Sequence, residues 1–384
     1  MVDIEGVKIP RFTNEYWTAK QRQANALHEV SYRACFKPQL PKFFIEWLTE
    51  KGDIVYDPFS GRGTTMLEAA LLGRNVIAND INPLSRILSE PRLLIPDLKK
   101  LEEHLNNIET DMNSEAEIDL SMFYHPKTEA EMVSLKNYLK QKKENNKEDE
   151  LDLWIRMVAT NRLTGHSKNF FSVYTLPPNQ AISAEKQKRI NKERNQKPEY
   201  KNVREIILKK TKDLLKEVDE QTAQTLHDVS LQAKFLNSNA AETTAIKNNS
   251  VQLSVTSPPF LDVVLYAADN WLRCWFNNID PERIAKSVTM SKTVEEWGKV
   301  MGKVFSELFR ITKNGGFVAF EVGEVRGGKI KLDEVVVPLG KNAGFNCECI
   351  LVNQQMFTKT ANIWGVSNNK KGTNTNRIVL FSKQ

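Results

Sequence analysis

A buried strand, a glycine-containing turn, a helix and a second strand follow one another early in the chain, and this succession constrains the fold most. Ile54-Val55-Tyr56 predicts the first strand, which runs into Asp57-Pro58-Phe59-Ser60-Gly61-Arg62-Gly63-Thr64-Thr65. A helix is expected from about Thr65 to Leu72. The second strand, Asn75 to Ala78, ends at Asn79-Asp80-Ile81-Asn82-Pro83. The order predicts an α/β fold with its ligand at the ends of these strands.

The turn and the acid after the second strand have the spacing of a nucleoside site. Asp80 follows Gly61 by about 20 residues, so glycines would admit the ligand and the carboxylate would accept bonds from ribose hydroxyls. A P-loop lacks support, because no Gly-Lys-Ser/Thr sequence follows Gly63. Asp57, before the turn, suits a ligand with a positive charge near an amino-acid end. S-adenosylmethionine, with its ammonium and sulfonium, is such a ligand.

A second short motif follows another predicted strand, Val251 to Val255. Ser257-Pro258-Pro259-Phe260 stops that strand, because neither proline has an N–H and each fixes φ near −65°. The Ser257 hydroxyl and the Pro258 carbonyl could meet the two N–H groups of an exocyclic amine, with Phe260 stacked on its ring. The alternative is a strand end that merely begins a loop, and the upstream motif favours the first interpretation.

The composition predicts a cytoplasmic protein with no membrane segment. The chain has 384 residues, of which 40% are hydrophobic, and no apolar run approaches the length of a membrane helix. The N-terminus lacks a signal-peptide pattern. The four cysteines are scattered without metal-ligand or disulfide spacing, so no metal site is predicted.

Positive charge is concentrated in one segment, residues 185–216, which has 12 Lys/Arg and 5 Asp/Glu in a chain with a net charge of +6. Such a segment is expected at a contact with a polyanion, and a solvated helix face is the alternative. Two helices separated near Pro198 are predicted here. The candidate nucleic-acid contacts are Lys186, Arg189, Lys192 and Arg194.

The α/β alternation is interrupted between residues 84 and about 235, where helical patterns dominate, and then resumes. We therefore expect residues 1–95 and 230–384 to form one domain and residues 96–229 to form a mainly helical insertion. Two neighbouring strands near the C-terminus, 346–353 and 377–382, suit an antiparallel edge of the sheet.

Both motifs resemble those of bacterial S-adenosylmethionine-dependent DNA methyltransferases that modify exocyclic amines. The turn after Tyr56 is similar to their cofactor loop, and Asp80 to their ribose-binding acid. Ser238-Asn239-Ala240 resembles the adenine-contacting segment, although an aspartate is more usual than Asn239. His28-Glu29-Val30-Ser31 with Phe36 resembles the segment that covers the methionine part of the cofactor. The resemblance implies catalytic residues Ser257, Pro258, Pro259 and Phe260, and cofactor-binding residues His28, Ser31, Phe36, Asp57, Phe59, Gly61, Gly63, Thr64, Thr65, Asp80, Asn82 and Asn239.

The resemblance also implies a Rossmann-like methyltransferase sheet, S-adenosylmethionine as cofactor, double-stranded DNA as partner, and the insertion as target-recognition domain. A cognate restriction endonuclease is a further candidate partner, and association with the nucleoid would follow from DNA binding. In this family a serine before Pro-Pro usually accompanies cytosine N4, so the expected product is N4-methylcytosine. Adenine N6, RNA or protein methylation, and a catalytically silent DNA-binding protein are the alternatives. Carbon-5 methylation is disfavoured, because Phe260 stands where a cysteine nucleophile is needed.

Overall fold

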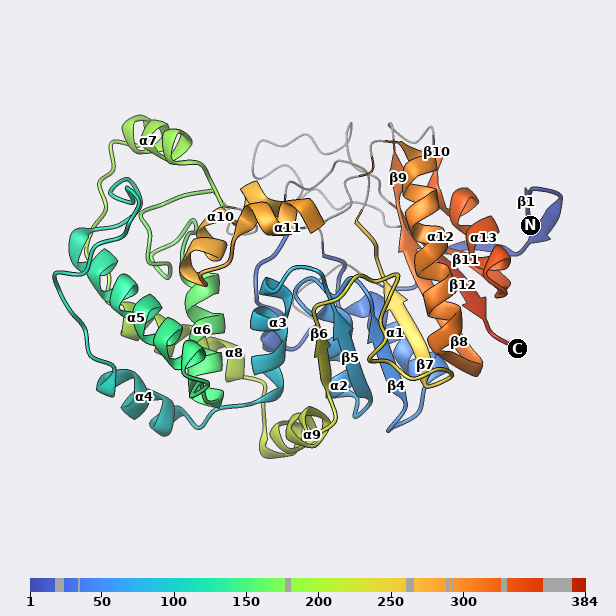
Figure 1. Ribbon diagram of the computed structural model, residues 1–384, viewed down its shortest axis with the longest axis horizontal. Coiled ribbons are helices and arrows are strands. Elements are labelled where there is room, and N and C mark those ends of the chain that lie inside the picture. Colours follow the sequence, from blue (N-terminus) through green and yellow to red (C-terminus); the bar gives the residue numbers. More distant parts are fainter. Residues whose placement is uncertain are drawn as a thin grey trace.

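One mixed sheet of eight strands organises the protein, whose computed structural model describes residues 1–17, 24–33, 35–176, 181–259, 266–287, 291, 293–325, 330–354 and 375–384. The spatial order is β3-β11-β12-β8-β7-β4-β5-β6 (Figure 1). In that order the strands are Arg11–Asn14, Asn346–Gln354, Thr375–Ser382, Thr312–Val322, Val251–Thr256, Ile54–Asp57, Asn75–Asn79 and Lys234–Leu236. The predicted Rossmann-like α/β class is confirmed.

The strand order reverses between β4 and β7. From β4 the chain steps outward to β5 and β6, then returns to place β7 on the other side of β4, and all neighbouring strands from β6 to β8 are parallel. The carboxyl ends of β4 and β7 therefore flank a topological switch point, where open α/β sheets bind their ligands. This puts the two sequence motifs side by side.

The C-terminal strands pair as predicted, but they do not form the edge of the sheet. β12 is antiparallel to both β8 and β11, and β3 then pairs in parallel with β11 outside them, with Arg11 opposite Ile350. All four residues of β3 are exposed. The strand therefore carries no alternation of apolar and polar residues, which is the pattern that would have revealed it.

The two faces of the sheet carry different layers. On β4, Val55 points into a core with the helices α1 (Gln39–Leu48) and α2 (Thr64–Leu71), whereas Tyr56 points into a second core with α12 (Val294–Ile311) and α13 (Leu332–Asn342). This alternation is the period of two that a strand buried on both faces requires. The remaining short elements are β1 (Val2–Ile4), β2 (Val7–Ile9), β9 (Glu324–Val325), β10 (Ile330–Lys331) and the 3₁₀ turns Ala26–His28 and Glu90–Leu93.

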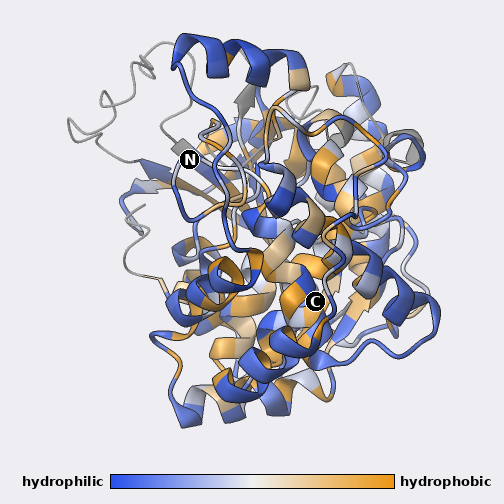
Figure 2. Ribbon diagram, turned by 90° about the vertical axis from the view of Figure 1, so that its left-hand side faces the viewer, coloured by the Kyte–Doolittle hydropathy of each residue, from blue (hydrophilic) through white to orange (hydrophobic). Residues whose placement is uncertain are grey.

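The segment between β5 and β6 is helical and shares the first core. Its helices are α3 (Leu84–Ser89), α4 (Leu98–Asn107), α5 (Pro126–Glu144), α6 (Glu150–Arg162), α7 (Ala184–Glu193), α8 (Val203–Leu215) and α9 (Glu220–Ser230). The predicted break near Pro198 lies between α7 and α8. We call residues 96–229 the insertion, with the bounds expected from the sequence. Seen from its outer side, its helices alternate between hydrophilic and hydrophobic residues, as amphipathic helices do (Figure 2). Leu101, Trp154 and Ile207 join it to the core beneath α2.

Helices α10 (Tyr266–Phe276) and α11 (Pro281–Ser287) follow β7 and lie on the same side of the molecule as β9, β10 and α7 (Figure 1). That side carries the carboxyl end of β8, because β9 follows it directly. No helix in the described ranges has both the length and the apolar character needed to cross a bilayer.

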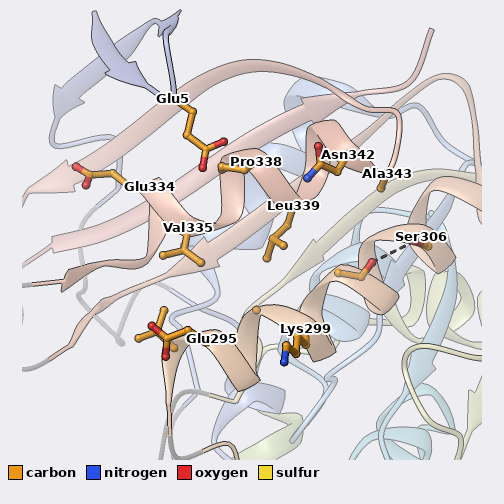
Figure 3. A pocket seen from close by; sticks show the side chains of 13 residues that line it. Glu5, Glu295, Lys299, Ser306, Glu334, Val335, Pro338, Leu339, Asn342 and Ala343 are labelled. Atoms are coloured by element: carbon orange, nitrogen blue, oxygen red, sulfur yellow. Dashed lines mark hydrogen bonds between the residues drawn. The ribbon is translucent and has the colours of Figure 1, made fainter.

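A surface groove of about 660 Å³ separates α12 from α13 (Figure 3). Gly298 of α12 lines this groove, and a Cβ added there would meet nothing within 4 Å. Gly340 of α13 differs, because an added Cβ would collide with the ring of Phe381. That ring is fully buried among Phe305 and Phe345, so it has little freedom to move.

We expect Gly340→Ala to lower the free energy of unfolding by about 1–3 kcal/mol, because overpacking strains a filled core. The matched change Gly298→Ala should raise it by about 0.5–1 kcal/mol, because alanine restricts the unfolded chain and has room in the groove. Urea titration of both variants measures the two effects. Equal effects at both positions would contradict the assigned packing.

Candidate active site

Hydrogen bonds tie the Ser257-Pro258-Pro259 stretch and the end of β7 to β4, α2 and α12. The Thr256 hydroxyl donates to Asp57 Oδ1 at 2.6 Å, and the Thr65 hydroxyl donates to the Val255 carbonyl at 3.0 Å. The Trp297 indole N–H donates to the Pro259 carbonyl at 3.0 Å. The stretch is therefore held in one position relative to the cofactor loop. Phe260 lies outside the described residues.

The predicted cofactor loop, residues 57–65, has the backbone shape that its glycines require. Asp57 Oδ1 accepts the Phe59 amide at 3.0 Å, and Gly63, with φ 74°, caps the N-terminus of α2. A Cβ at Gly63 would lie 2.6 Å from Ser89 Cβ, so no larger residue fits. Thr64 and Thr65 form the first turn of α2 and are buried.

Asp80 brings the end of β5 against that loop. Its Oδ2 accepts the Gly61 amide at 2.8 Å, and its Oδ1 accepts the Asn82 amide at 2.9 Å. Each carboxylate oxygen therefore keeps a lone pair for a further donor. Asn82 also donates to the Tyr32 hydroxyl at 3.3 Å, and the Tyr32 ring lies 3.7 Å from the Cβ position of Gly61.

The segment after β6 meets the same edge of the sheet. Asn79 bonds both backbone groups of Ser238, at 3.0 Å each, and also donates to the Pro58 carbonyl at 3.2 Å. Asn239 is exposed, and its Oδ1 accepts the Ala241 amide at 3.0 Å. Asn239, the predicted adenine-contacting residue, therefore lies at the same edge of the sheet as Asp80, and its side-chain oxygen already accepts a hydrogen bond within a local turn.

The predicted N-terminal segment packs on the loop through its backbone. Arg62 donates to the carbonyls of His28 and Val30, at 3.2 and 2.8 Å. The buried Arg92 donates to the Leu27 carbonyl at 3.2 Å and also bonds the Arg62 carbonyl. These two arginines were not among the predicted site residues, and the sequence signals only that Arg62 stands between two glycines.

The side chains of His28 and Phe36 point into the protein rather than provide exposed contacts. His28 Nε2 lies 2.7 Å from Glu68 Oε1, and burial lowers the pKa of the imidazole, so the neutral ring is favoured. Phe36 packs on the first core. The carbonyl of Ser31 accepts bonds from Asn161 of α6 and Arg273 of α10, at 3.1 and 2.9 Å.

Three carboxylates lie at this edge, where Asp57 and Glu321 are buried and Asp80 is half-buried. Burial raises the pKa of Asp57 to about 7 and that of Asp80 to about 6, in spite of the hydrogen bonds that they accept. Burial also raises the pKa of Glu321, the residue before the last in β8. Glu321 was not predicted, although an acid in the otherwise apolar run Phe317–Val322 is a usable signal. A cationic ligand would favour the ionised forms of these groups.

The predicted nucleic-acid contacts lie on α7 and just after it. Lys186, Arg189, Lys192 and Arg194 are all exposed, whereas Gln187 and Ile190 face the interior. The Gln187 amide donates to the Tyr174 carbonyl at 3.0 Å, and the Arg194 guanidinium stacks 3.8 Å from the centre of the Tyr174 ring. The helix is therefore fastened by one face and presents its cations on the other.

Other cations of the basic segment serve the fold instead. Lys201 donates to the Ser172 carbonyl, and Arg204 donates to the Ile108 carbonyl and the Thr110 hydroxyl. Lys210 is 7% exposed and pairs with Glu29 at 3.1 Å. These three side chains are therefore engaged within the fold, whereas the exposed cations of residues 185–216 include those of α7 and also Lys197, Lys209, Lys212 and Lys216.

The chain is similar to known DNA methyltransferases over part of its length. A family model described as DNA methylase matches residues 6–86. The type II methyltransferase M.MjaII of Methanocaldococcus jannaschii is 38% identical over 74 residues, which are 19% of this chain and 14% of that protein. The type II methyltransferase M.MvaI of Kocuria varians is 34% identical over 97 residues, 24% of this chain and 20% of that protein. The chain thus matches less than a quarter of either relative.

A solved structure gives a weaker match. A Thermus thermophilus protein described as a DNA modification methylase, in complex with S-adenosyl-L-methionine, is 20% identical, with a TM-score of 0.24 over 38% of this chain and 53% of that one. The matches in sequence confirm the resemblance to amino-methyltransferases of restriction–modification type. The family match covers the cofactor loop and Asp80 and ends before the Ser-Pro-Pro stretch.

We expect Asp57→Asn to stabilise the ligand-free protein in a pH-dependent way. A carboxyl with a raised folded-state pKa contributes stability that is present below its ordinary pKa of 3.8 and is lost as the pH rises through about 7. The amide avoids this loss, so the gain should be on the order of 1–4 kcal/mol at pH 8 and should shrink towards pH 5. Thermal unfolding at both pH values, with the exposed Asp228→Asn as control, tests this. A gain independent of pH would contradict it.

Proposed function

We propose that this protein transfers a methyl group from S-adenosylmethionine to the exocyclic N4 amine of a cytosine flipped out of double-stranded DNA. One observation carries the proposal. The loop after β4, the carboxylate of Asp80 and the Ser257-Pro258-Pro259 stretch meet at the switch point of the sheet, with Thr256 bonded directly to Asp57. A nucleoside cofactor and an amine acceptor would therefore lie beside one another, which is the arrangement that direct transfer needs.

The loop and its neighbours fit S-adenosylmethionine. Gly61 and Gly63 leave room for a ligand along the backbone, and Asp80 keeps lone pairs for ribose hydroxyls. The Ser60 hydroxyl is buried in the loop without a hydrogen-bond partner among the described residues, so a ligand group could satisfy it. When bound, the cofactor supplies a methyl group on a positively charged sulfur. Asp57 and Asp80 would stabilise positive charge in this dry site.

The base would be held at Ser257 and Pro258. A cytosine amine is a weak nucleophile because its lone pair is delocalised into the ring. Hydrogen bonds from the amine to the Ser257 hydroxyl and the Pro258 carbonyl would favour a pyramidal nitrogen with its lone pair aimed at the methyl group. Extracting the base from the duplex costs a few kcal/mol, and stacking on Phe260 would return about 1–3 kcal/mol of that.

DNA would bind along the side that carries α7. The exposed cations of α7 and the switch point lie on the same side of the molecule (Figure 1). Phosphate contacts from such a helix position the duplex without reading its sequence. Residues 96–229 would act as the target-recognition domain. A cognate restriction endonuclease would be a functional partner that cleaves the same DNA site when it is unmethylated.

Ser257→Ala tests the base site. We expect the methylation rate to fall roughly 10-fold or more while cofactor affinity stays constant, because the hydroxyl holds the amine only in the reacting complex. The surface change Ser306→Ala serves as control. Digesting the methylated DNA to nucleosides and identifying them by mass spectrometry gives the product. N6-methyladenine as the main product would replace the cytosine assignment, and an unmethylated substrate would overturn the proposal.

Neutralising the exposed cations near α7 tests the DNA surface. The quadruple change of Lys186, Arg189, Lys192 and Arg194 to Gln should weaken DNA binding and reduce the slope of log K against log salt by about 3 to 4, because fewer counterions are released. The control changes four exposed lysines outside residues 185–216, Lys99, Lys100, Lys143 and Lys147, to Gln. If the control flattens the slope as much, the effect is general charge and not a contact at α7.

A further inference from the structure

Glu321 and Ser257 lie at the carboxyl ends of adjacent parallel strands. Thr256 of β7 pairs with Phe320 of β8, so the next residue of each strand comes to the same level at the edge of the sheet. The Ser257 hydroxyl lowers the pKa of the Glu321 carboxyl beside it, as a hydrogen-bond donor would, against the stronger effect of burial. From the other side, Asn376 of β12 donates to Glu321 Oε1 at 2.7 Å. The carboxylate is thus bonded from β12 and stands beside the Ser257 side chain that follows β7.

The fold alone gives little reason for a carboxylate here. Glu321 is 7% exposed and stands between the buried residues Phe320 and Val322. Burying a carboxylate costs far more than burying a neutral amide of the same size. A glutamine could also bond Asn376 and Ser257. We therefore look for a functional role of the Glu321 carboxylate.

The reason lies in the direction of the single Ser257 hydrogen. In its ionised form, which a cationic cofactor at this site would favour, the Glu321 carboxylate only accepts hydrogen bonds, so the hydroxyl hydrogen would point at it. The oxygen of Ser257 then presents lone pairs alone to whatever lies in front of it. A group that donates N–H is bound, and a carbonyl oxygen at the same place is repelled, because both atoms would be acceptors.

We infer that Glu321 is a positioning residue that makes the base site selective for exocyclic amines over ring carbonyls by orienting the Ser257 hydroxyl. The inference rests on the proposed function and deepens it. Cytosine and adenine would be accepted, and uracil, thymine and guanine at its O6 edge would be refused. Sites built around one hydrogen-bond polarity reject the opposite polarity strongly, because their buried polar groups are left unpaired.

Glu321→Gln tests this at constant size. The amide can donate to Ser257, which frees the hydroxyl hydrogen to turn towards the base. We expect kcat to fall roughly 10- to 150-fold, the size of a lost charge-assisted hydrogen bond. The affinity for S-adenosylmethionine should not change. Glu334→Gln, an exposed position on α13, removes the same charge as a control.

Two further measurements separate orientation from a general structural effect. The double variant Ser257→Ala/Glu321→Gln should be no slower than Ser257→Ala alone, because Glu321 acts through that hydroxyl. Duplexes with uracil in place of the target cytosine should bind the wild type more weakly than the cytosine duplex, and Glu321→Gln should lose most of this difference. If Glu321→Gln does not fold, Glu321→Asp withdraws the carboxylate from Ser257 and should show the same losses.

The outcomes can be told apart. If Glu321→Gln slows the Ser257→Ala background as much as it slows the wild type, or leaves the preference for cytosine over uracil intact, the inference is wrong while the methyltransferase proposal stands. If the wild type methylates no exocyclic amine in DNA although it binds S-adenosylmethionine, the proposed function fails first. Full activity in both Glu321 variants would show that Glu321 has no positioning role, and the inference would be wrong.

Discussion

The hydrogen bond from Thr256 to Asp57 joins the two strands between which the sheet changes direction, and the geometry of the candidate site depends on it. This bond directly connects the loop that would hold a cofactor with the stretch that would hold a base. The hydroxyl of Thr65 repeats the connection one residue earlier in β7. Because both bonds are buried, they are not weakened by competition with water, and they hold the two halves of the site together.

The sequence indicates those parts of the site that depend on neighbouring residues. Asp57, the glycines, Asp80 and Ser257 each follow a predicted strand, and their place at one edge comes from the parallel order that an α/β pattern implies. A helix from about Thr65 to Leu72 and a pair of helices separated near Pro198 were predicted from the sequence, whereas α3, α9 and α11 were not. β3 was not, because an exposed edge strand of four residues has no pattern to read.

The contacts that sequence reasoning missed all depend on pairing between distant strands or loops. Glu321 meets Ser257 only because β8 lies beside β7 in a particular register, and Asn376 reaches it from β12. Arg62 and Arg92 bond carbonyls of the N-terminal segment, and carbonyls leave no trace in a residue pattern. The sequence shows the positive charge of residues 185–216, but it does not show which of these side chains are buried, as Lys210 is.

The N-terminal segment that covers the cofactor loop is held by the insertion as well as by the loop. Glu217 accepts the Ala26 amide at 2.9 Å, Lys210 pairs with Glu29, and Asn161 donates to the Ser31 carbonyl. The insertion is therefore not a detachable module. A homologous segment grafted in its place would need to bring these three side chains with it, so exchange of the insertion is constrained by its contacts with residues 26–31 as well as by its own outer surface.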